Sequence, residues 1–170
     1  MTRMSSTRSI VGIDPSSRGL AFAFFEEGAL LDWGTRRRDG QELGVLDDLL
    51  KRCQADVLVL EDGDAPGSER RPRMRRLLGA LADHAGKQGV VVVPVSRSKV
   101  RDEWLMRGKS TKHEVAAGIA ELFPDLEPLV PPPRKFYNSE KARTNIFDAA
   151  SLVLTAFPRY GSEASEPGGL

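Results

Sequence analysis

Three acidic residues stand in segments whose neighbours are mostly apolar. Asp14 ends the run SIVGID (9–14), Glu61 lies near the end of ADVLVLED (55–62), and Asp148 lies within NIFDAASLVLT (145–155). Carboxylates are rarely buried unless they are paired or bind a metal. Close carboxylates also disfavour one another's ionisation, which hard divalent cations such as Mg²⁺ or Mn²⁺ relieve. If the three segments meet, the acids can hold a pair of such ions, which is an arrangement suited to phosphodiester cleavage.

Two of these acids occupy similar positions in strand-like runs. Side chains alternate along a strand, so Asp14 shares a face with Gly12, and the glycine leaves that face open just before the acid. Glu61 shares a face with Val59, whereas Asp62 points the other way. If the two strands are parallel neighbours, Asp14 and Glu61 converge at their carboxyl ends.

The third acid lies in a segment with helical character. Asn145 precedes Asp148 by three residues and therefore lies on the same helix face. Ala149 and Ala150 follow the acid and are small enough for close packing on a sheet. This helix is thus expected to bring Asp148 against the strands.

Each acid also has an ordinary structural explanation. Asp14 is compatible with the start of a turn, Glu61 with an exposed strand end, and Asp148 with an ion pair to Arg143. The combination is more specific than any single residue, because three separate elements place acids where one common site can form.

The hydrophobic pattern predicts an α/β fold with a mixed sheet flanked by helices. We expect strands at 9–14, 20–26, 29–37, 55–62 and 89–95, and helices at 41–53, 70–87, 98–106, 111–122 and 142–157. The first three strands are joined by short turns and form an antiparallel meander. The apolar runs 55–62 and 89–95 are typical of buried strands. We expect a flexible N-terminus (1–8), one domain (9–157) and a disordered tail (158–170).

Composition limits the class of protein. Of the 170 residues, 40% are hydrophobic, and no 18-residue apolar run predicts a membrane span. Residues 1–9 lack the apolar core of a secretory signal, and the single cysteine, Cys53, excludes an internal disulfide. These features favour a cytoplasmic protein. The net charge of +1 does not indicate a polyanion partner, but arginines gather in ERRPRMRR (69–76), which fits either phosphate binding or a solvated helix face.

Taken together, the acid-bearing segments resemble a known family. IVGIDPSSRGLAFAF (10–24), VLVLED (57–62) and NIFDAASLVLT, in this order and spacing, resemble the RNase H-like fold of the RuvC family of Holliday-junction resolvases. The first segment is similar to that family's GIDPG…TG opening, and the last to its DAADALALA helix. The resemblance covers residues 9 to 157.

The resemblance implies a Mg²⁺- or Mn²⁺-dependent endonuclease, with two ions, that cleaves branched DNA as a homodimer. It implies metal ligands at Asp14, Glu61, Asn145 and Asp148 and a catalytic role for Lys112. The basic residues that we expect to contact DNA are Arg70, Arg71, Arg73, Lys99, Lys112, Arg134 and Lys135. The helix that carries the first of these arginines is also a candidate dimer interface.

Two departures from the family pattern keep other functions open. Asn145 stands where the family usually has an acid, and an amide oxygen adds no negative charge. The segment after Glu61, DGDAPGSERRPRMRR, lacks the aromatic residue that junction resolvases insert near the crossover. One alternative is a catalytically weakened RNase H-like protein that binds nucleic acid. Another is a phosphotransferase of the actin-like ATPase group, which normally needs two such domains.

Overall fold

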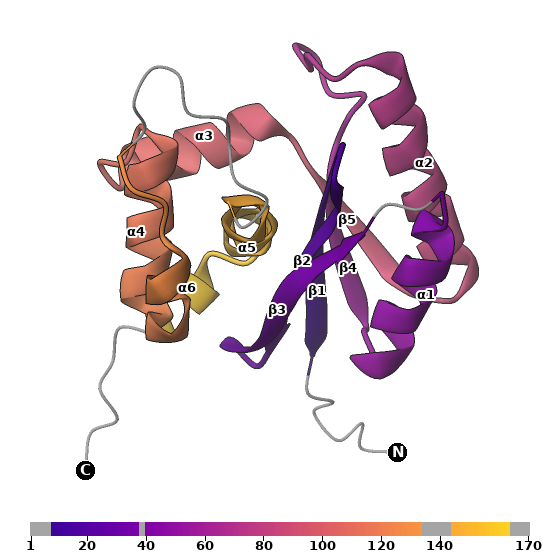
Figure 1. The fold of residues 1–170 in the computed structure, drawn as a ribbon, viewed down its shortest axis with the longest axis horizontal. Coiled ribbons are helices and arrows are strands. Elements are labelled where there is room, and N and C mark those ends of the chain that lie inside the picture. The colour runs from indigo at the N-terminus through magenta and orange to yellow at the C-terminus, as the bar shows by residue number, and fades with distance from the viewer. Residues whose placement is uncertain (1–7, 38–39, 134–143, 164–170) are drawn as a thin grey trace.

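The computed structural model describes residues 8–37, 40–133 and 144–163, and within them one mixed five-stranded sheet lies between two layers of helices (Figure 1). The strands are β1 (Ser9–Ser16), β2 (Gly19–Glu26), β3 (Ala29–Arg37), β4 (Val57–Glu61) and β5 (Val91–Val95), in the spatial order β3-β2-β1-β4-β5. The pairs β1–β2 and β2–β3 are antiparallel, whereas β1–β4 and β4–β5 are parallel. The predicted α/β class, with its antiparallel meander and parallel strands, is confirmed.

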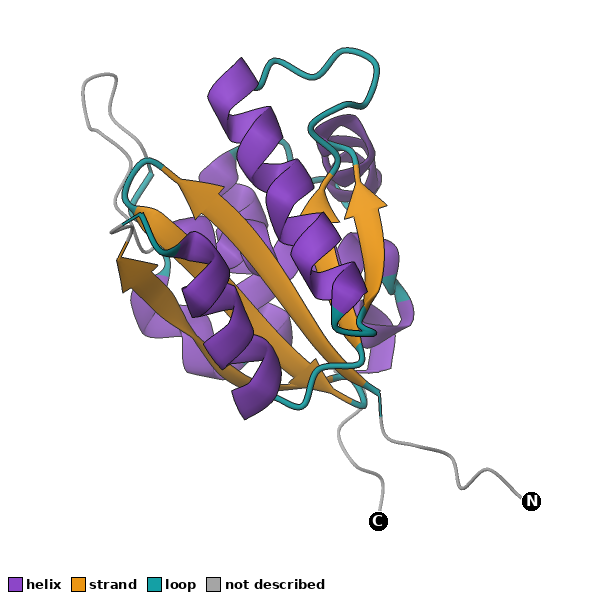
Figure 2. Cartoon of the chain, turned by 90° about the vertical axis from the view of Figure 1, so that its right-hand side faces the viewer, coloured by secondary structure: helices purple, strands orange, loops and turns teal. Residues whose placement is uncertain are grey.

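The helices cover both faces of the sheet. They are α1 (Glu42–Arg52), α2 (Pro72–Lys87), α3 (Arg97–Met106), α4 (Lys112–Leu122), the 3₁₀ helix η1 (Pro124–Leu129), α5 (Thr144–Ala156) and α6 (Arg159–Glu163). Helices α1 and α2 lie on one face, and α5 lies on the other, with α3, α4 and α6 outside it (Figures 1 and 2). Among the described residues, no helix has both the length and the apolar content needed to cross a membrane.

Two short helices were not predicted from the sequence. Proline-containing η1 follows α4 directly, and α6 lies in the segment 158–170 that we expected to be disordered. The ring of Tyr160 in α6 stacks on Phe25 and Phe157, with centroid separations of 6.2 and 5.7 Å. Ordered structure therefore continues beyond residue 157, because an aromatic contact with β2 holds this last turn of helix.

Alternation along β1 divides the core into two parts. Ile10 belongs to the apolar cluster that includes α5, whereas Val11 and Ile13 belong to the cluster that includes α1 and α2. Gly12 is opposite Val59 in the parallel register of β1 and β4. Two residues further along both strands, Asp14 and Glu61 follow on the face covered by α5.

The prediction that 89–95 is a buried strand was wrong. Among the described residues, strand β5 is an edge strand whose one partner is β4, and Val91 is 60% exposed. A run of valines looks the same in an edge strand as in a central one, so the hydrophobic pattern did not distinguish them. Pro94 is the informative residue, since a residue without an N–H is tolerated mainly at sheet edges.

Helix α5 approaches the sheet closely over Gly12. A Cβ atom on this residue would lie 2.4 Å from the carbonyl oxygen of Ala149 and 2.6 Å from Cγ2 of Val153. Ala149 itself is fully buried. The pairing of glycine with alanine therefore lets the backbone of α5 lie almost on β1, which places the adjacent Asp148 near the end of that strand.

We predict that Gly12→Ala destabilises the protein by about 3 kcal/mol, because the new methyl group meets main-chain atoms that cannot rotate away. Urea unfolding measures the change. Gly79→Ala is the control, since its Cβ in α2 meets nothing within 4 Å, and it should stabilise by about 0.5–1 kcal/mol. Equal effects of the two substitutions would contradict this account of the α5 contact.

Candidate active site

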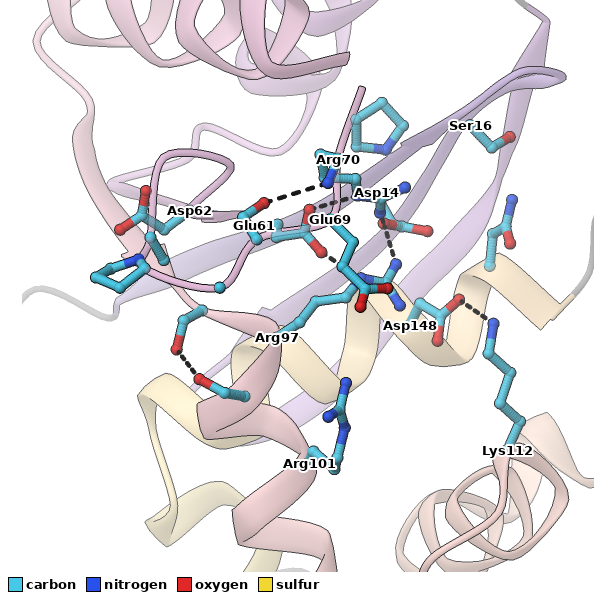
Figure 3. Close-up of a pocket in the computed structure, with 18 residues that line it drawn as sticks. Asp14, Ser16, Glu61, Asp62, Glu69, Arg70, Arg97, Arg101, Lys112 and Asp148 are labelled. Carbon is cyan, nitrogen blue, oxygen red and sulfur yellow. Dashed lines mark hydrogen bonds and ion pairs between the residues drawn. The ribbon is translucent and has the colours of Figure 1, made fainter. Parts of the chain in front are cut away.

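A cavity of about 510 Å³ opens where β1 and β4 end (Figure 3). Its wall includes all five residues predicted from the sequence to bind metal or act in catalysis: Asp14, Glu61, Lys112, Asn145 and Asp148. They come from β1, β4, α4 and α5, so elements far apart in the sequence meet here. The structure brings these residues together, and their chemical roles stay predictions.

The acids differ in their access to water. The side chains of Asp14 and Glu61 are only 5% and 3% exposed, whereas that of Asp148 is 25% exposed. The first two are held by the ends of central strands beneath α5, and the third projects from the helix surface. Two carboxylates are thus buried at the base of the cavity, and buried carboxylates need positive partners.

Two arginines supply that positive charge (Figure 3). Arg70 Nε donates to Glu61 Oε2 at 2.5 Å, and its Nη2 lies 3.6 Å from Asp14 Oδ1. Arg97 makes the same pattern from the other side, with Nε donating to Glu61 Oε1 and Nη2 lying 3.8 Å from Asp14 Oδ1. Each guanidinium therefore bridges both buried acids.

The third acid faces a lysine. Lys112 Nζ lies 3.9 Å from Asp148 Oδ2, and Lys112 is the first residue of α4. The predicted capping box fixes this start: Thr111 Oγ1 accepts from the N–H of Glu114 at 3.1 Å. The Glu114 carboxylate accepts from the N–H of Ser110 at 2.9 Å. The cap thereby sets the point from which the lysine reaches the cavity.

Burial controls the electrostatics of Asp14. Desolvation first, and then repulsion from Asp148, raise the pKa of this carboxyl to about 7 from its ordinary 3.8. The nearby guanidinium groups of Arg97 and Arg70 act in the opposite direction and offset only part of the rise. A further cation close to Asp14 would therefore favour its ionised form.

The donor set fits a hard divalent cation in its chemistry. Asp14, Glu61 and Asp148 offer carboxylate oxygens and Asn145 an amide oxygen, which are the ligands that Mg²⁺ and Mn²⁺ prefer. In the part of the chain that the structure describes, no three His, Cys, Asp or Glu side chains are close enough together to hold a metal ion. The buried acids instead face arginine, so the carboxylates would have to close around an ion.

The basic residues predicted to contact DNA differ in their position relative to the cavity. Arg70 lies inside the cavity on the acids, whereas Arg71 and Arg73 are exposed at the start of α2. Lys99 is exposed on α3 and does not line the cavity. Arg134 and Lys135 lie outside the described residues. Contact with DNA stays a prediction for all of them.

Sequence reasoning missed Arg97 and Arg101, which both line the cavity from α3. The signal was present in VPVSRS, because Arg97 follows the end of β5 by two residues. Ligands of open α/β sheets gather at the carboxyl ends of the strands. The same rule that selected Glu61 would have selected this arginine.

Comparison with solved structures identifies the fold. RuvC of Thermus thermophilus matches with a TM-score of 0.58 and 20% identity over 91% of this chain and 95% of that one. The fold is that of the RuvC resolvases. RuvC of T. thermophilus in complex with a Holliday junction substrate matches with a TM-score of 0.59 and 19% identity, over 92% of this chain and 96% of that one. The yeast mitochondrial Holliday junction resolvase matches with a TM-score of 0.58 and 12% identity, over 96% of this chain and 82% of that one.

The similarity to RuvC was found by comparison of structures and not by comparison of sequences. No protein-family model matches the chain, and no curated protein matches it by sequence. The resemblance recognised in the acid-bearing segments is confirmed at the level of the RNase H-like fold.

The raised pKa of Asp14 predicts a pH dependence of stability in metal-free buffer. Between the ordinary pKa of 3.8 and about 7, the folded state holds a proton that the unfolded state has lost, so wild-type stability falls as pH rises. Asp14→Asn cannot ionise. Its free energy of unfolding relative to wild type should therefore rise by a few kcal/mol, on the order of 1.4 kcal/mol per pKa unit, between pH 4 and 8.

Urea unfolding with EDTA at several pH values measures this difference. Asp62→Asn is the control, because it removes a half-buried carboxylate from the wall of the same cavity. It should change the pH profile less than Asp14→Asn. If the free energies of unfolding of wild type and Asp14→Asn change in parallel with pH, burial of the Asp14 carboxylate does not destabilise the folded state.

Proposed function

We propose that this chain is a divalent-metal-dependent endonuclease that cleaves phosphodiester bonds of branched DNA. The observation that carries the proposal is the cavity at the ends of β1 and β4, where Asp14, Glu61 and Asp148 come together with Asn145 and Lys112. Support also comes from the fold, since one RuvC with this architecture is described in complex with a Holliday junction substrate.

In this proposal the acids and Asn145 hold two Mg²⁺ or Mn²⁺ ions. Such ions, when bound, supply an activated water and stabilise the leaving oxygen of a phosphodiester. Lys112 has its ammonium group on the wall of the cavity, from which it can contact a phosphate oxygen and orient the scissile bond. The apolar packing of α5 on β1 keeps Asp14 and Glu61 in a fixed relation during this chemistry.

The wider surface fits a strand of nucleic acid that crosses the cavity. Exposed Arg71 and Arg73 stand at the start of α2, and Lys99 stands on α3. We propose that they contact backbone phosphates on the two sides of the cavity, in a sequence-independent manner. We further propose that the protein forms a homodimer, which would present two cavities to the two strands of a junction. Light scattering, which measures the mass of the protein in solution, tests this proposal.

The first test is cleavage of labelled four-way junction, duplex and single-stranded DNA in Mg²⁺ and in Mn²⁺. Asp14→Asn should lower the rate by about 100-fold or more, since loss of an outer partner of a metal ligand alone costs 10–100-fold. DNA binding in EDTA should persist. Asp62→Asn serves as the matched control on the same wall. Full activity of Asp14→Asn would contradict the proposal.

Asn145 offers a second test. It lines the cavity three residues before Asp148. Asn145→Asp adds a negative charge and should lower the metal concentration for half-maximal cleavage several-fold, because carboxylates bind hard cations more strongly than amides. Asn145→Ala should shift that concentration upward. Identical metal titrations for the three proteins would show that residue 145 does not face an ion.

The arginine pairs also favour a second candidate function, a nucleic-acid-binding protein that kept the fold but does not cleave. Arg70 and Arg97 already neutralise the buried acids, and Asn145 weakens the donor set. Such a protein would bind four-way junctions yet leave them intact in both Mg²⁺ and Mn²⁺. The cleavage assay therefore separates the two functions directly.

A further inference from the structure

The two buried acids have their oxygens committed to arginine. Glu61 accepts from Arg70 through Oε2 and from Arg97 through Oε1, and both guanidinium groups also face Asp14 Oδ1 (Figure 3). A divalent cation at this position would need those same oxygens. Arginine and metal therefore compete for one set of acceptors, and both cannot hold it at full strength.

The arginines are far more accessible than the acids. Their side chains are 25% exposed for Arg70 and 44% exposed for Arg97, against 5% or less for Asp14 and Glu61. Arg70 lies in the segment before α2, and Arg97 is the first residue of α3. A rotation of these long side chains can take the guanidinium groups out of the cavity without moving a strand, whereas the acids are fixed.

The charges that line the cavity indicate what would displace the side chains of Arg70 and Arg97. In the described part of the chain, five carboxyl groups and four basic side chains line the cavity: Asp14, Glu61, Asp62, Glu69 and Asp148, and Arg70, Arg97, Arg101 and Lys112. Entry of a divalent ion alone would leave an excess of positive charge next to the buried acids, which is costly. A DNA phosphate supplies the missing negative charge, and it is also a strong bidentate partner for arginine.

We propose that Arg70 and Arg97 are exchangeable counterions, which hold the acids in the DNA-free protein and transfer to backbone phosphates when DNA binds, so that metal ions take their place. The inference rests on the proposed metal site. Its consequence is that DNA and metal bind with positive coupling: the protein binds metal weakly until a phosphate backbone is present. By linkage, metal tightens DNA binding by the same factor.

The direct test is Mn²⁺ binding to the DNA-free protein, measured as free Mn²⁺ by electron paramagnetic resonance. Arg70→Gln and Arg97→Gln should each bind Mn²⁺ at least about 5-fold more tightly than wild type, and the double variant more tightly still. Arg101→Gln is the matched control. Arg101 lines the same cavity and carries the same charge, but among the described residues it is not an ion-pair partner of Asp14 or Glu61.

Thermal unfolding covers the case in which the double variant is unstable. In EDTA the variants should melt below wild type, because buried carboxylates have lost their partners. Mn²⁺ should raise the melting temperature of the variants more than that of wild type or Arg101→Gln. In stopped-flow anisotropy, Mn²⁺ should tighten junction binding by wild type before cleavage proceeds, and this gain should shrink in the double variant.

The outcomes separate this inference from the proposed function. If wild type cleaves DNA but the two variants bind Mn²⁺ no more tightly than Arg101→Gln, the exchange is wrong and the nuclease proposal stands. If even the double variant binds no Mn²⁺, with or without DNA, the metal site itself is wrong, and the exchange is wrong with it.

Discussion

The contact between α5 and β1 over Gly12 is the constraint on which the candidate site depends. Because residue 12 has no side chain, the backbone of α5 lies against the strand at Ala149. Asp148 then lies close enough to Asp14 for repulsion between them to raise the pKa of Asp14. The grouping of Asp148 with Asp14 therefore depends on this packing as well as on the acids themselves.

A second constraint is that buried carboxylates do not remain without partners. The protein meets it with side chains from three directions: Arg70 from the segment before α2, Arg97 from α3 and Lys112 from α4. These contacts do more than neutralise charge. Arg70 and Arg97 link the segment before α2 and helix α3 to the ends of β1 and β4, and Lys112 links α4 to α5, so the polar site also joins the outer elements at an edge of the apolar core.

Most of the fold could be read from the sequence, because periodicity in the strands and helices is strong and their turns are short. The acids of β1, β4 and α5 were found for a physical reason: a carboxylate within an apolar run is conspicuous. Arg97 was not found, because a basic residue in a polar loop is ordinary until the neighbouring strand end is known. The edge position of β5 was also missed, since local hydrophobicity does not report which strands lie beside it.

The last acid of the site lies far from the first along the chain. Asp14 and Glu61 lie in the first half of the chain, whereas Asp148 belongs to α5, the helix that covers both of their strands. During synthesis on the ribosome, the chain therefore acquires its third carboxylate only after the two strands that carry the others have been made. A truncated or nascent chain lacks both the third acid and the helix that buries the other two. Assembly of the site thus depends on α5, and a chain that has not yet added this helix has no complete set of acids.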